Sequence, residues 1–255
     1  MYSENSFFKP KSDTPKETKL GYFKATKKAS YSLLASLPLL IGYEILIRVE
    51  KSTIINGMAN WVQEFVGLIG FWGSIVMGVL VVALCIFTVQ KDRKQGIKIK
   101  KAYLLGMTLE SILYAFILAP LVTFVFFGQK LIIFESEPGK ITQFALCLGA
   151  GFYEEFFFRF LFIGFPFVLL DNMYPEKKMF LPKFFIFMIS AAIFSYVHYT
   201  GAGGDIFTWK SFIFRMGAGI VLGIIFLLRG FGVAAWTHAI YDILIVFGIL
   251  KLITG

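Results

Sequence analysis

The stretch ITQFALCLGAGFYEEFFFRFLFIGFPFVLL, from Ile141 to Leu170, decides the fold class of this chain. Its 30 residues include only three charged side chains, those of Glu154, Glu155 and Arg159. A helix of about 20 apolar residues is long enough to cross a bilayer, and a charged group inside such a helix is rare and usually functional. The stretch therefore predicts a transmembrane helix with a polar site in its middle.

Six other apolar runs accompany this one in a chain of 255 residues, of which 57% are hydrophobic and 16% are charged. A soluble globule could not bury so many apolar residues, the same content excludes disorder, and two cysteines are too few for a disulfide scaffold. We therefore expect an all-α, polytopic transmembrane helix bundle of about seven spans. The six further runs are Ala29–Ile47, Leu68–Val89, Ala102–Phe127, Leu181–Tyr199, Phe212–Leu228 and Phe231–Leu250.

Basic residues are concentrated where they would face one side of the membrane. Of the 25 Lys and Arg, seven lie in the first 28 residues and six lie between Lys91 and Lys101. Lys and Arg accumulate in cytoplasmic loops, so we interpret the net charge of +9 as a sign of topology. Binding to nucleic acid is not expected, because the chain has no soluble domain for it. We expect a multi-pass protein of a cell membrane, with its N-terminus in the cytoplasm and its C-terminus outside.

The chain divides into three regions. Residues 1–28 are rich in Lys, Ser and Thr and have no apolar period, so they are expected to form a flexible basic cytoplasmic tail. Residues 29–140 hold the N-terminal transmembrane spans, and residues 141–255 hold the last four. The run Ala29–Ile47 is longer than the apolar part of a signal peptide, so it is interpreted as a retained first span. The segment Ser52–Val66 is interpreted either as an interfacial helix or as one that packs against a span.

The last four spans hold ionisable residues where the bilayer disfavours them, by about 2.5–3.5 kcal/mol for each charge. Both histidines of the chain belong to this set. We interpret the set as a functional site, because it exceeds what helix packing requires. Single residues in other places, Glu44, Glu110 and Arg215, are instead interpreted as hydrogen-bonding residues that hold the bundle together. The six residues of the expected site are Glu154, Glu155, Arg159, His198, His238 and Asp242.

Helical geometry separates these residues into groups. Glu155 and Arg159 are four residues apart, so they lie on one face and can form an ion pair. Glu154 points about 100° away from that face. The same spacing of four stacks His238 over Asp242. Two imidazoles with one or two carboxylates can hold a zinc-like ion or orient a water molecule, with a further carboxylate as base, and the residues alone leave both interpretations open.

Three short motifs on three different spans carry a resemblance to a known family. The motifs are EExxxR at Glu154-Glu155-Phe-Phe-Phe-Arg159, FxxxH at Phe194-Ser-Tyr-Val-His198 and HxxxN/D at His238-Ala-Ile-Tyr-Asp242. The spacings are 39 residues from the arginine to the first histidine and 40 between the histidines. Over the region from Ile141 to Leu250, the chain resembles the CPBP family of intramembrane proteases. That family includes type II CAAX prenyl endopeptidases and bacteriocin-processing or immunity proteins.

The resemblance implies that residues 141–255 form a CPBP-like catalytic region. Glu154 would activate the attacking water with help from His198. Glu155 would orient Arg159, so that these two residues support the site structurally.

The third motif would supply His238 and Asp242 to stabilise the oxyanion of the tetrahedral intermediate, or to bind a metal. Eukaryotic CAAX proteases of the family have Asn at the position of Asp242, and Asn can donate a hydrogen bond to an oxyanion. An ionised Asp242 would repel the oxyanion, so it must be protonated, hold His238 in its donor tautomer or bind a metal. No cofactor is certain. Zinc is the candidate, with Glu154, His198, His238 and Asp242 as its ligands.

The sequence thus predicts an intramembrane endopeptidase that hydrolyses a peptide bond of a membrane-associated or hydrophobic peptide. Its partners would be membrane lipids and that peptide. A non-catalytic membrane scaffold or bacteriocin immunity protein of the same fold is the alternative, and a transporter is disfavoured because no inverted halves are recognisable. We expect a bacterial source, which would favour a signalling peptide, a bacteriocin leader or a lipoprotein fragment over a prenylated substrate.

Overall fold

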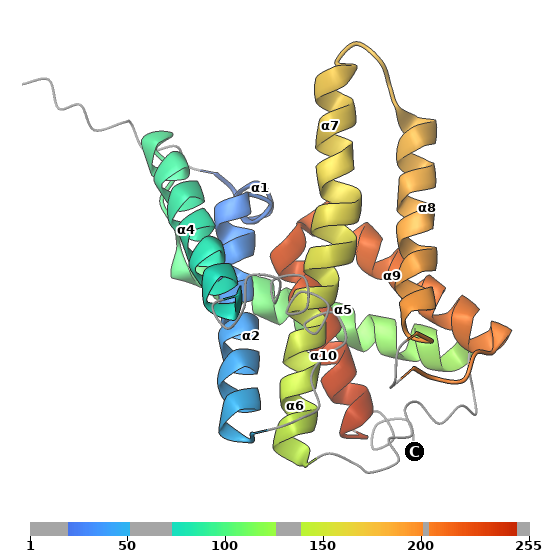
Figure 1. The fold of residues 1–255 in the computed structure, drawn as a ribbon. Helices are drawn as coiled ribbons and strands as arrows, with labels where there is room; N and C mark the ends of the chain where they lie inside the picture. The colour runs from blue at the N-terminus through green and yellow to red at the C-terminus, as the bar shows by residue number, and fades with distance from the viewer. Residues whose placement is uncertain (1–19, 52–72, 126–138, 201–203, 249–255) are drawn as a thin grey trace, which may run out of the picture.

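The computed structural model describes residues 20–51, 73–125, 139–200 and 204–248 (Figure 1). Within these ranges every regular element is a helix, so the predicted all-α class is confirmed. In chain order the elements are α1 (Tyr22–Thr26), α2 (Ala29–Val49), α4 (Gly73–Lys94), α5 (Lys101–Val125), α6 (Lys140–Gly149), η2 (Ala150–Glu154), η3 (Phe156–Gly164), α7 (Phe165–Met173), α8 (Phe180–Val197), α9 (Trp209–Arg229) and α10 (Phe231–Val246).

The helices lie where the seven spans were predicted. Five helical segments are long and apolar enough to cross a membrane: α2, the first 18 residues of α5, the continuous run from α6 to α7, α8 and α9. Helix α10 is apolar but shorter, with 16 residues, and α4 occupies the position of the second predicted span. The chain is therefore a multi-pass membrane protein. The segment Ser52–Val66 lies outside the described residues.

The longest helical run carries the first motif. It extends without a break over 34 residues, from Lys140 to Met173, which corresponds to about 51 Å at about 1.5 Å per residue. The hydrocarbon core of a bilayer is only about 30 Å thick, so this run must tilt or extend past it. Figure 1 shows that α7 and α8 form a hairpin that extends away from the other helices. The exposed Lys177 and Lys178 lie in its turn.

The middle of this run is wound as a π-helix rather than an α-helix. The segments η2 and η3 adjoin Glu155 on either side. π-Helical turns are rare and are frequently found at functional sites. A π-helical turn contains more residues than an α-helical turn. The side chains of this segment therefore do not follow the α-helical period of 3.6 residues per turn.

The end of the N-terminal tail differs from the prediction. Residues 1–19 lie outside the described residues, but the tail ends in helix α1. Tyr22 donates a hydrogen bond to Glu110 Oε2 of α5 (2.8 Å), and Arg229 of α9 donates one to Thr26 Oγ1 (3.0 Å). Burial and the contact with Glu110 raise the pKa of Tyr22 to about 12, so it remains a donor at neutral pH. Residues 22–26 of the predicted tail thus form a helix whose partners lie far away in the sequence.

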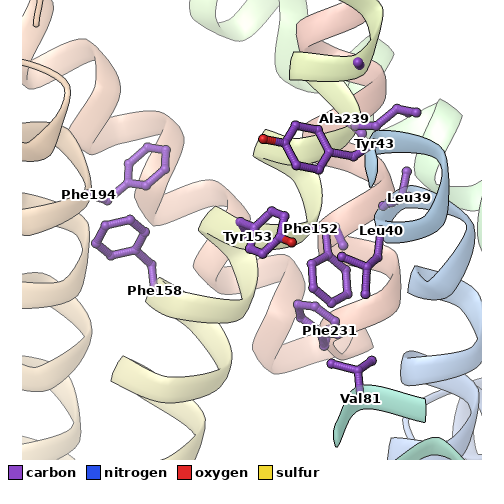
Figure 2. Packing of buried hydrophobic residues seen from close by; sticks show 13 residues of the cluster. Leu39, Leu40, Tyr43, Val81, Phe152, Tyr153, Phe158, Phe194, Phe231 and Ala239 are labelled. Atoms are coloured by element: carbon purple, nitrogen blue, oxygen red, sulfur yellow. The ribbon is translucent and has the colours of Figure 1, made fainter. Parts of the chain in front are cut away.

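The largest buried cluster joins α2, the π segments and α10 (Figure 2). Leu39 and Leu40 of α2 lie beside Phe152 of η2 and Phe231 of α10. The rings of Phe152 and Phe231 are 5.8 Å apart, nearly perpendicular to each other. This packing holds the first-motif helix against α10, which carries the third motif.

Gly151 allows η2 and α10 to approach each other closely. A Cβ atom at this position would lie 2.6 Å from the carbonyl oxygen of Ala235 and 2.6 Å from the Cβ of Ala239. Neither is the far end of a flexible side chain, so neither can move aside without moving α10. The segments that carry Glu154 and His238 can meet at this distance only with glycine at position 151.

Replacing Gly151 by Ala should therefore lower the free energy of unfolding by about 1–3 kcal/mol, which is typical of overpacking. Thermal unfolding of the purified protein in detergent measures the change. Gly217→Ala in α9 is the matched control, because a Cβ there meets nothing within 4 Å. The control should keep or slightly raise stability, since Ala is favoured over Gly in helices. Equal stability of the two variants would contradict the close contact.

Candidate active site

Three elements bring the six predicted residues to one place. The π segments of the long helix and the residue between them carry the EExxxR motif, His198 follows the end of α8, and α10 carries the HxxxD motif in its second half. Each of the six residues lies within 4 Å of at least one other member, as the individual contacts show. The structure thus places the predicted site residues together.

The expected ion pair between Glu155 and Arg159 is present and almost completely buried. Arg159 Nη1 lies 2.7 Å from Glu155 Oε1, and the side chains are 1% and 0% exposed. Arg159 Nη2 also donates a hydrogen bond to the carbonyl oxygen of Gly219 in α9 (3.1 Å), and its guanidinium lies 4.4 Å from the centre of the Phe194 ring. The arginine therefore links the long helix to α8 and α9.

Glu155 has a second partner that the sequence did not reveal. His238 Nδ1 lies 2.8 Å from the same oxygen, Glu155 Oε1. An ionised carboxylate only accepts hydrogen bonds, so the nitrogen must be the donor. Glu155 thereby fixes the orientation of the His238 ring and directs Nε2 toward the site. The two residues are 83 positions apart, and no pattern in a single sequence could have linked them.

The second histidine is oriented by the backbone. His198 Nδ1 lies 2.8 Å from the carbonyl oxygen of Phe194, one helical turn earlier. Because a carbonyl oxygen can only accept, Nδ1 carries the proton, and Nε2 of the neutral ring is an acceptor. This contact also explains the spacing of the FxxxH motif, in which Phe194 supplies both the carbonyl oxygen and a ring that lies 5.1 Å from the His198 ring.

Glu154 lies between the two histidines. Its Oε2 is 3.9 Å from His198 Nε2 and 3.9 Å from His238 Nε2. These distances are too long for direct hydrogen bonds, but they suit contacts through one water molecule. One carboxylate oxygen and two imidazole nitrogens thus converge on the same small region.

Asp242 is the third carboxyl-bearing residue of the site, stacked one turn after His238 as its spacing predicted. Its Oδ2 lies 3.5 Å from His238 Nε2. The side chain of Asp242 is 26% exposed and that of His198 is 29% exposed, whereas that of Glu154 is 12% exposed. His198 and Asp242 are therefore the more exposed side chains and form the open edge of the site.

A metal site is not apparent in this arrangement. Over the described ranges, no group of three or more His, Cys, Asp or Glu side chains has the spacing to hold a metal ion. The zinc expectation for Glu154, His198, His238 and Asp242 stays a prediction, and no step of the proposed reaction uses a metal.

The three single residues of the other spans hydrogen-bond within the bundle, as expected. Glu44 pairs with Arg48 on its own helix and accepts from Tyr153. Glu110 pairs with Arg229, and Arg215 pairs with Asp205 in the loop that follows His198. None of them is among the contacts that link the six site residues.

Replacing Arg159 by Leu should reduce the free energy of unfolding by about 3–5 kcal/mol, because the carboxylate of Glu155 would stay buried without its cation. Unfolding in mixed micelles measures the loss. The matched control is Arg48→Leu, which removes another pair at a spacing of four whose arginine side chain is 59% exposed. An exposed pair contributes about 1 kcal/mol or less. If the two variants lost the same free energy of unfolding, the buried Glu155–Arg159 pair would not stabilise the protein more than the exposed Glu44–Arg48 pair.

Comparison with known proteins finds a family model that matches part of the chain. Residues 139–244 match the family model described as Rce1-like, Type II CAAX prenyl endopeptidase Rce1-like. The match runs from the residue before α6 into α10 and includes all six site residues. No curated protein and no solved structure matches the chain. The matched residues 139–244 make up less than half of the chain, and the match supports membership of the CPBP family of proteases, as the three motifs predicted.

Proposed function

We propose that the chain is an intramembrane endopeptidase in which Glu154 and His198 activate a water molecule. The substrate would be a membrane-associated or hydrophobic peptide. The observation that carries this proposal is the convergence of His198 Nε2 and His238 Nε2 on Glu154 Oε2, each at 3.9 Å. Membership of a protease family supports a peptide as the substrate.

In the proposed reaction, a water molecule lies between Glu154 Oε2 and His198 Nε2. Both atoms are acceptors, so the water directs both protons toward them and a lone pair toward the substrate carbonyl. Glu154 takes one proton as general base while the water oxygen bonds to the carbonyl carbon. The carbonyl electrons become the oxyanion of the tetrahedral intermediate. Glu154 then gives the proton to the leaving amine as the C–N bond breaks, which yields an acid and an amine.

His238 suits the stabilisation of that oxyanion. Its Nδ1 donates to Glu155, and its Nε2 faces the carboxylate oxygens of Asp242 and Glu154 at 3.5 and 3.9 Å. When each nitrogen of a histidine ring faces a hydrogen-bond acceptor, the form of the ring in which both nitrogens carry a proton is favoured. Asp242 would thus hold His238 in its donor form, which explains how an aspartate can occupy a position where Asn would donate directly.

The Glu154→Gln variant should lose at least about 100-fold in kcat/KM, the typical contribution of a general base. The assay uses protein reconstituted in liposomes and a quenched fluorescent hydrophobic peptide, in prenylated and unprenylated forms. Glu176→Gln, in the exposed α7–α8 turn, is the matched control and should keep parental activity. Thermal unfolding should be the same for both variants. Parental cleavage by Glu154→Gln would remove this residue from the mechanism.

The His198→Ala variant separates the enzyme from the non-catalytic alternative. We expect it to lose activity by about 100-fold or more, because the water would lose its second acceptor. Comparison of the peptides in membranes containing the parent, Glu154→Gln or His198→Ala should reveal products only with the parent. If both variants complement a deletion phenotype as well as the parent does, a scaffold or immunity role is supported instead.

Zinc can be tested independently of cleavage. Ligation by the four predicted residues would give about one zinc per chain in elemental analysis, and His198→Ala would lose it. A zinc content far below one per chain, together with full cleavage in the presence of a chelator, would exclude the metal.

A further inference from the structure

The segment that carries Glu154 is supported by a residue of α2, outside the matched domain. The hydroxyl of Tyr153, which directly precedes Glu154, donates a hydrogen bond to Glu44 Oε1 across 2.5 Å. Tyr153 is only 7% exposed. A buried tyrosine hydroxyl needs such an acceptor, so the bond fixes where this side chain points.

Aromatic packing around the bond is equally specific. The rings of Tyr43 and Tyr153 are 5.5 Å apart at 74° to each other. A Cβ atom at Gly149 would lie 2.6 Å from the Tyr43 ring, so glycine lets α2 lie close to the start of η2. Figure 2 shows the Tyr153 ring on the side of its helix that faces α2, opposite Phe158 and Phe194. Tyr153 therefore anchors this turn from the side that faces α2.

The conformation of this turn makes the support important. Residues Ala150–Glu154 form a π-helix, which is less regular than an α-helix and persists where surrounding contacts hold it. A small rotation of the turn about its axis would change the 3.9 Å separations between Glu154 and the two histidines. The hydrogen bond from Tyr153 to Glu44 opposes such a rotation.

We propose that Glu44 is a positioning residue that, through Tyr153, keeps Glu154 directed toward His198 and His238. The inference rests on the proposed function of Glu154. Glu44 also pairs with Arg48, one turn later on α2, and Arg48 Nη1 donates to the carbonyl oxygen of Glu44 (2.8 Å). This pair is not needed for positioning, because it uses the other carboxylate oxygen, Oε2, whereas Tyr153 donates to Oε1, and the Arg48 side chain is 59% exposed.

Four variants test the proposal in the liposome cleavage assay. Tyr153→Phe and Glu44→Ala remove the hydrogen bond, and each should lower kcat about tenfold or more with KM within about twofold, as expected for a misplaced catalytic group. Glu44→Gln keeps an acceptor oxygen for Tyr153 and should restore kcat to within about threefold of the parent. Arg48→Gln removes the contacts of Arg48 but leaves the bond from Tyr153 to Glu44, so it should keep parental kcat and KM.

The outcomes are distinguishable. Parental kcat in both Tyr153→Phe and Glu44→Ala, with Glu154→Gln inactive, would overturn the positioning role but leave the proposed function intact. Activity losses in all four variants that follow their melting temperatures would also overturn it, because they would reflect stability alone. Parental cleavage by Glu154→Gln would instead overturn the proposed function, and the positioning role with it.

Discussion

The carboxylate of Glu155 is the constraint on which the site depends. It is completely buried. Its Oε1 forms an ion pair with Arg159 Nη1 (2.7 Å) and accepts a hydrogen bond from His238 Nδ1 (2.8 Å). A buried carboxylate is tolerated only where donors compensate for the water it has lost. The cation of the ion pair lies on the same helix as Glu155 and the hydrogen-bond donor lies on α10, so these two contacts fix how the two helices face each other. The direction of His238 Nε2 follows from the same requirement.

The site is layered by exposure. Glu155 and Arg159 form a closed inner layer, whereas His198 and Asp242 lie at an open edge with more than a quarter of each side chain accessible. Phe194 joins the layers, because its ring lies against the Arg159 guanidinium and near the rings of both histidines. The inner layer can therefore hold the geometry, and in the proposed reaction peptide and water need to reach only the outer layer.

The sequence predicted what depends on local spacing. Apolar runs located the helices, and spacings of four residues predicted the contacts of Glu155 with Arg159 and of His238 with Asp242. It could not predict the π-helical segments, because a period of 3.6 assumes regular α-helix. Nor could it predict the contact of Glu155 with His238, which is set by the tertiary packing of helices far apart in the chain.

The helices outside the matched domain contribute to the site without a motif of their own, and the type of contact explains this. Trp236 Nε1 of α10 donates to the carbonyl oxygen of Ala35 in α2 (2.6 Å), and Ser111 of α5 donates to the carbonyl oxygen of Val233 in α10 (3.1 Å). A backbone acceptor is present whatever side chain the residue carries, so such contacts place little demand on the sequence around the acceptor. Helix α2 can therefore hold α10, and with it His238, through Trp236 while leaving no signature comparable to the three motifs, whereas α5 contributes one side-chain hydroxyl, that of Ser111. The bond from Tyr153 to Glu44 also depends on a side chain outside the matched domain, so a single substitution in α2 removes it.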